Sequence, residues 1–142
     1  MTDTLKSLTE TTFDSVEGYR KAAEKADSPA LKQALNQRRE KREQTLAALN
    51  GELTRQGTDS VTSGTVQGAA HRLWVDITDM FERGDEAAAE RVEEGEDHLL
   101  GQFKDALESQ DLAPAEREIV QTCYNEICEG ERFGDMIEKQ YD

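Results

Sequence analysis

The chain has 142 residues and no apolar run that approaches the ~20 residues of a membrane span. Its first ten residues, MTDTLKSLTE, also lack the basic and then apolar pattern of a secretory signal peptide. Only two cysteines occur, Cys123 and Cys128, and their spacing favours neither a disulfide between them nor a CxxC metal site. We therefore expect free, partly buried thiols and a cytoplasmic protein.

Basic side chains are also scarce. Against 31 Asp and Glu there are 17 Lys and Arg, which gives a net charge of −14. Such a field repels the phosphates of DNA, RNA and anionic membranes. We expect no nucleic-acid partner and no membrane span. The acidity fits either an ordinary soluble surface or adaptation to a salty cytoplasm.

What the chain does have is helical periodicity. Its hydrophobic fraction of 35% and charged fraction of 34% would suit a disordered chain if the apolar residues were scattered. They recur instead at three- and four-residue spacings, which indicates amphipathic helices around one core in a single domain, residues 1–142. The spacing predicts helices over about 4–26, 29–57, 66–81, 85–110 and 114–141, with a polar connection over 58–65.

Local signals also predict how these helices are connected. Ser28 before Pro29 is a helix start, because a hydroxyl caps the helix and proline at the first position loses no hydrogen bond. The connection before it is so short that the first two helices must form an antiparallel hairpin. Pro114 starts the last helix in the same way. The predicted architecture is an all-α, ferritin-like four-helix bundle made of two antiparallel hairpins joined by a short extra helix.

One carboxylate interrupts an apolar helix face. Val92, Leu99 and Phe103 lie on one face of the predicted helix over 85–110, and Glu96 falls on that same face. A carboxylate facing a core must be paired, protonated or bound to a metal, because an unpaired buried charge is very costly. Glu96 is therefore the main functional lead in the sequence.

Two arginines are candidate partners for this carboxylate. Arg38 and Arg42 project into the apolar face of the second helix, whereas Glu40 falls at its edge or outside it. A guanidinium presents a rigid fork of donors that matches a carboxylate. The interpretation we favour is a buried ion pair of Glu96 with Arg38 or Arg42. Metal ligation by Glu96, or a place at the edge of the face, stays open.

Four segments of the chain resemble one family. They are GYRKAA (18–23), SPALK (28–32), GTVQGAAHRLW (64–74) and GDEAAAERVEEGEDHLL (84–100). They are similar to a bacterial family of uncharacterised ferritin-like four-helix-bundle proteins, a domain of unknown function. The resemblance implies a ferritin-like fold and kinship with di-iron proteins, and it implies no biochemical role.

A ferritin-like di-metal centre takes a Glu from each of two helices and an E-x-x-H pair from each of the other two. Neither the second nor the fifth predicted helix contains E-x-x-H, and Val16 stands at the position that matches Glu96. The nearest fragments, Gln37-x-x-Glu40 and Glu126-x-x-Glu129, fall beside the apolar faces. A metal site for iron or manganese would have to use an atypical set, namely Glu96, Glu40, Glu126, Glu129 and His71.

Motifs for common enzyme chemistry do not occur: there is no glycine-rich phosphate loop and no Ser-His-Asp or Cys-His arrangement. We therefore assign no catalytic residue. The favoured hypothesis is a non-catalytic ferritin-like bundle that acts through its surface, as a homodimer or with a protein partner, in an interaction or stress-associated role. The alternative is a metal-binding protein or oxidase with an atypical carboxylate site.

Overall fold

The structure is a computed structural model that describes residues 2–64, 69–81 and 83–141. Within these ranges all regular secondary structure is helical, which confirms the predicted all-α class. The helices are α1 (Thr2–Lys25), α2 (Pro29–Arg55), α3 (Ala69–Phe81), α4 (Asp85–Glu108) and α5 (Pro114–Gln140). The predicted bounds agree to within a few residues, and the part of the third helix predicted over 66–68 lies outside the described residues.

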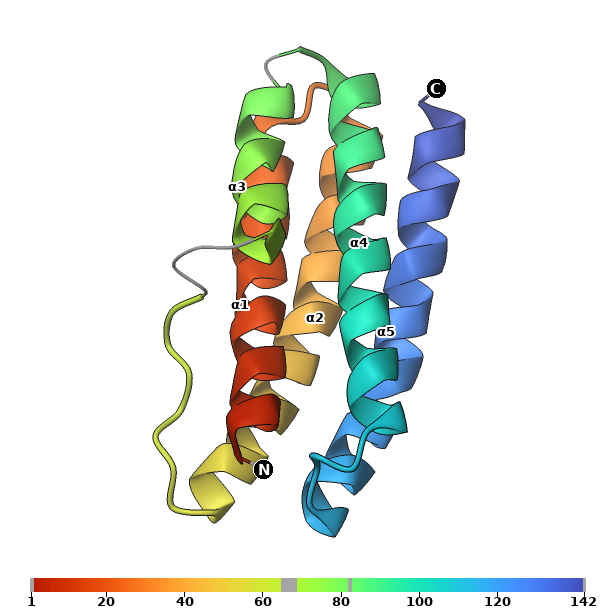
Figure 1. The fold of residues 1–142 in the computed structure, drawn as a ribbon. Helices are drawn as coiled ribbons and strands as arrows, with labels where there is room; N and C mark the ends of the chain where they lie inside the picture. The colour runs from red at the N-terminus through yellow and green to blue at the C-terminus, as the bar shows by residue number, and fades with distance from the viewer. Residues whose placement is uncertain (1, 65–68, 82, 142) are drawn as a thin grey trace.

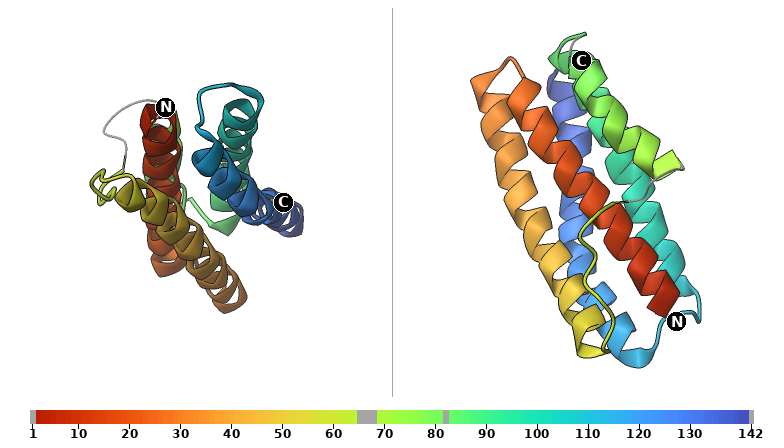
Figure 2. Two further views of the ribbon diagram at one scale, coloured as in Figure 1. Left: turned by 90° about the horizontal axis from the view of Figure 1, so that it is seen from below. Right: turned by 90° about the vertical axis from the view of Figure 1, so that its left-hand side faces the viewer.

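Four long helices run side by side, and the short α3 lies against two of them (Figure 1). Helices α1 and α2 form one antiparallel hairpin, and α4 and α5 form the other. Helix α3 covers the upper half of the α1–α4 side, whereas α2 and α5 lie away from it (Figure 2). Among the described helices, none combines the length and the apolar composition that a membrane span requires.

The hairpin turns are held by the polar residues that begin each helix. The Ser28 hydroxyl accepts a hydrogen bond from the Leu31 N–H at 3.2 Å, as expected of a capping residue. The Asp85 carboxylate accepts from the N–H groups of Asp27 and Ser28, both at 2.9 Å, so the first residue of α4 fastens the α1–α2 turn. At the other end of the bundle, Glu116 accepts from the Ala113 N–H at 2.9 Å.

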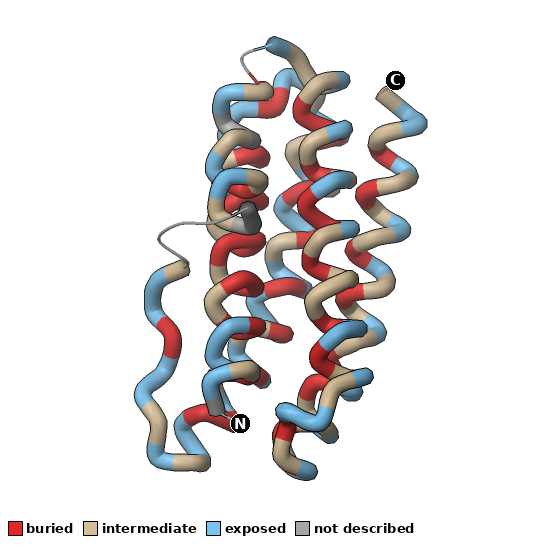
Figure 3. Tube along the Cα trace, viewed as in Figure 1, coloured by how far each residue is buried: buried red, intermediate tan, exposed pale blue. Residues whose placement is uncertain are grey.

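The core consists of two apolar clusters, one in each half of the bundle. Buried residues follow the helices along the whole height of the bundle (Figure 3). The upper cluster includes Leu35, Trp74 and Val92, and the lower one includes Leu49 and Leu99. Along α2 and α4 the buried side chains between the two clusters are polar, namely Arg38, Arg42, Thr45 and Glu96. The polar layer at mid-height is therefore the feature that divides the core.

Trp74 anchors α3 to the bundle and is 2% exposed. A Cβ on Gly18 of α1 would lie 2.5 Å from the Trp74 ring, and a Cβ on Gly95 of α4 would lie 2.8 Å from the same ring. Both glycines are therefore needed for α3 to pack against α1 and α4. Within the described structure the indole Nε1 has no acceptor, so the bond to a carboxylate that tryptophan often makes does not occur there.

Candidate functional site

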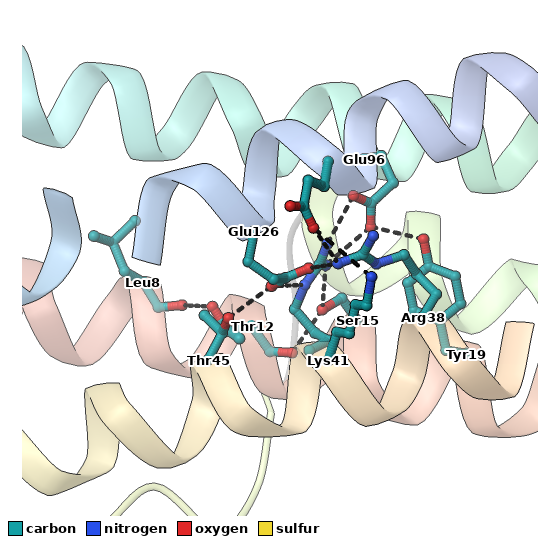
Figure 4. A network of polar contacts seen from close by, with 11 residues as sticks. Leu8, Thr12, Ser15, Tyr19, Arg38, Lys41, Thr45, Glu96 and Glu126 are labelled. Carbon is teal, nitrogen blue, oxygen red and sulfur yellow. Dashed lines mark hydrogen bonds and ion pairs between the residues drawn. The ribbon is translucent and has the colours of Figure 1, made fainter. Parts of the chain in front are cut away.

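The buried polar layer centres on one bidentate ion pair (Figure 4). Arg42 of α2 and Glu96 of α4 are both fully buried. The two terminal nitrogens of Arg42 donate to the two oxygens of Glu96 at 2.9 and 2.8 Å. The Tyr19 hydroxyl also donates to Glu96 at 2.9 Å, and the Ser15 hydroxyl accepts from Arg42 at 3.0 Å. Three helices thus supply the hydrogen bonds that keep both charges out of water.

A second carboxylate completes the layer from α5. Glu126 accepts from Arg42 Nε and from the Thr45 hydroxyl, both at 2.7 Å, and it also pairs with Arg38. Glu126 lies at the edge of the buried face of α5, between the buried Cys123 and Ile127, and 15% of its side chain is exposed. The sequence interpretation placed it beside the apolar face, but it did not foresee that Glu126 contacts both arginines.

The layer is balanced in charge, since two guanidinium groups face two carboxylates. Burial alone would lower the pKa of Arg42, but the charges of Glu96 and Glu126 raise it above its usual value. Burial would raise the pKa of Glu126, but the neighbouring Arg42 holds it below its usual value. Burial and the Glu96 charge raise the pKa of Tyr19, so the phenol stays protonated and donates.

A glycine makes room for the ion pair. A Cβ on Gly130 of α5 would lie 2.0 Å from a Glu96 oxygen and 2.3 Å from an Arg42 nitrogen. One turn further, a Cβ on Gly134 would lie 3.0 Å from the backbone of Glu93. The two glycines therefore allow α5 to approach α4 closely at the level of the charged layer, as helix packing through small residues requires.

The structure brings two of the five candidate metal ligands together. Glu96 and Glu126 both bind Arg42, so a guanidinium stands between them. Glu40 is exposed, and Glu129 is 47% exposed with Arg38 at 3.8 Å. His71 lies on α3, where its Nδ1 is 4.0 Å from Asp14. In the described ranges there is no group of three or more His, Cys, Asp or Glu that could hold a metal ion.

Both cysteines are free thiols, with Cys123 buried and Cys128 partly buried, which agrees with the prediction from their spacing. Burial and the nearby Glu126 charge raise the pKa of the Cys123 thiol to about 11. A thiol with that pKa is almost entirely protonated at neutral pH and is a poor nucleophile. This cysteine therefore adds no reactive group to the charged layer.

The fold and the site define a class: an all-helical bundle whose centre is a largely buried, charge-balanced ion-pair layer. Residues 1–109 match the model of the family described as Domain of unknown function (DUF2383), and the chain belongs to that family. The matched region contains Arg38, Arg42 and Glu96, whereas Glu126 and Gly130 follow it. No curated protein and no solved structure matches the chain.

Proposed function

We propose that this protein is a non-catalytic, ferritin-like helical bundle that acts by binding a second copy of itself or another protein. The observation that supports the proposal is the position of Arg42, between the carboxylates of Glu96 and Glu126. Ferritin-like proteins hold their metal ions at the corresponding place, between carboxylates that project inward from facing helices.

The guanidinium does what a metal ion would otherwise do there. It neutralises the inward carboxylates and occupies their lone pairs through three hydrogen bonds of 2.7 to 2.9 Å. A metal ion held by Glu96 and Glu126 would displace the buried cation from both carboxylates with which it pairs, which would cost several kcal/mol. The residues at this centre therefore do not fit a di-iron or di-manganese site.

Metal content after anaerobic loading with Fe(II) or Mn(II) and thorough desalting tests the proposal. We expect the wild-type protein to retain substoichiometric metal. Retention of one or two ions per chain, lost in Glu96→Gln, would overturn the proposal and support the alternative of an atypical metal-binding protein or oxidase. The matched control is Glu90→Gln, because Glu90 is an exposed residue of the same helix.

The side of the bundle formed by α2 and α5 suits a second copy. The seven exposed residues of α4 comprise six acidic and one basic. By contrast, the exposed residues of α2 include two acidic and two basic, and those of α5 the same numbers. This side is therefore neutral in a protein of net charge −14, so two copies can meet there without strong repulsion.

The dimensions and composition of this side also fit a dimer. Each of α2 and α5 has 27 residues, so a strip about 40 Å long and roughly 20 Å wide is available, close to the ~800 Å² per partner of a standard interface. Met136 of α5 is 51% exposed there. Met136 and Phe133 line a groove between the two helices, together with residues of α2 such as Ala34 and Gln37.

Sedimentation equilibrium tests this face. The wild-type protein should dimerise, and Met136→Glu should make it monomeric. Val75→Glu is the matched control, because Val75 is exposed by 44% on α3, away from α2 and α5. A monomeric wild-type protein, or a monomer produced by Val75→Glu and not by Met136→Glu, would exclude the α2–α5 face.

A further inference from the structure

The α1–α4 side of the bundle is only half covered. Helices α1 and α4 have 24 residues each, whereas α3 has 13 and lies along their upper half (Figure 1). Below α3 the two long helices border an open groove of about 450 Å³, which we call the lower α1–α4 groove. Its lining includes Asp3, Ser7, Leu8, Asp105, Ala106 and Asp111.

The same pair of helices shows what kind of element this side accepts. In the upper half α3 packs on both α1 and α4, and it does so because small residues of each helix leave space for its side chains. In the lower half Ser7 of α1 and Ala106 of α4 are again small, and Leu8 provides a buried apolar floor. The groove therefore has the small side chains and the apolar floor on which a second short helix would pack.

Charge selects among the helices that could pack there. Asp3, Asp105 and Asp111 are exposed at the groove, and none of the described residues that line it is Lys, Arg or His. The amide Oε1 of Gln102, which also lines the groove, is buried and has no donor within the described structure. A basic side chain would supply both the missing charge and a hydrogen-bond donor.

We propose that the lower α1–α4 groove binds a cationic amphipathic helix of another protein, with its apolar face on Leu8 and Ala106 and its lysines or arginines toward Asp3 and Asp105. This inference rests on the proposed role as a binding protein. Another copy of this chain is a poor occupant, because the groove is acidic and each copy carries a net charge of −14. The uncovered half of α1, about 12 residues, matches an occupant of roughly three turns.

The test measures the affinity of a fluorescent synthetic peptide of leucine, alanine and lysine, patterned as a three- to four-turn amphipathic helix, by fluorescence anisotropy at about physiological ionic strength. The wild-type protein should bind this peptide at least about tenfold more tightly than a scrambled peptide of identical composition and charge. Asp3→Asn combined with Asp105→Asn should weaken binding by about tenfold. Ser7→Trp, which fills the groove without changing charge, should weaken binding to a similar degree.

Glu86→Gln combined with Glu90→Gln is the matched control, because it removes two exposed charges from α4 outside the groove. Its affinity should stay within about twofold of the wild type. Equal losses in both double variants, equal binding of both peptides, or no binding by the wild type would each overturn the groove assignment. The metal-content measurement is independent of these outcomes. If the peptide does not bind in the groove and the protein still retains no stoichiometric metal, the groove proposal is refuted and the proposed function is not.

Discussion

Replacing Glu96 by glutamine should destabilise the protein by about 3 kcal/mol, at the lower end of the range for breaking a buried pair. The substitution keeps the shape of the side chain and removes its charge. The oxygen that accepts from Arg42 at 2.8 Å can become an NH₂ group, which places donor against donor. Arg42 keeps its 2.7 Å bond to Glu126, and for that reason we do not expect a larger cost.

Urea denaturation followed by circular dichroism at the helical minimum measures this free energy of unfolding. Glu90→Gln serves as the control, since Glu90 is exposed on the same helix. A loss below about 0.5 kcal/mol for Glu96→Gln would refute the reasoning, because that is the range of ordinary surface substitutions. It would mean that the carboxylate contributes nothing as an anion.

A double variant separates charge balance from packing. Arg42→Met combined with Glu96→Met removes one cation and one anion and leaves Arg38 paired with Glu126. Because each single variant leaves an unbalanced buried charge, the double variant should be more stable than either single one. If the loss in the free energy of unfolding of the double variant instead equals the sum of the two single losses, Arg42 and Glu96 do not stabilise the fold as a pair.

Three further predictions concern the neighbourhood of this layer. Gly130→Ala should cost about 1–3 kcal/mol in urea denaturation, because its Cβ would lie 2.0 Å from Glu96, and stabilisation by the better helix former would contradict this. Arg42→Ala should gain thermal stability on addition of Mn(II) while the wild type does not, and equal responses would count against a role of the guanidinium in place of a metal ion. The hydrogen bond with Asp97, with burial and nearby carboxylates, raises the pKa of Glu93 from 4.5 to about 7. Its folded pKa exceeds its unfolded one, so the stability it contributes is fully present below pH 4.5 and lost as the pH rises through 7. Glu93→Gln should therefore flatten the decline of the melting temperature between about pH 5 and 8, and an unchanged slope would show that Glu93 is not responsible.

Much of the fold followed from local pattern. Helix bounds came from apolar spacing and from the start signals at Ser28, Pro29 and Pro114, because these features act within one or two turns of the chain. The apolar residues of the third helix predicted the helix itself, but not how it packs on the others. The packed position of α3 depends on Gly18 and Gly95, which belong to other helices and lie far from α3 in the sequence.

The candidate site was only partly accessible in the same way. The burial of Glu96, Arg38 and Arg42 followed from helical projection, since each stands on an apolar face. The sequence left open which arginine faces Glu96. The structure assigns Arg42 to Glu96 and places Arg38 on Glu126.

By itself, then, the sequence determined the all-helical class, the two hairpins, the acidic surface and the presence of charges on buried faces, because each depends on residue type and on spacing along one helix. Only the tertiary structure decided that Glu126 joins the layer, that Gly130 leaves room for it, and that a guanidinium stands between the two carboxylates. These depend on the relative rotation and offset of helices whose contacting residues, such as Arg42 and Glu126, are 84 positions apart. The spacing of residues within one helix does not determine the rotation and offset between two helices.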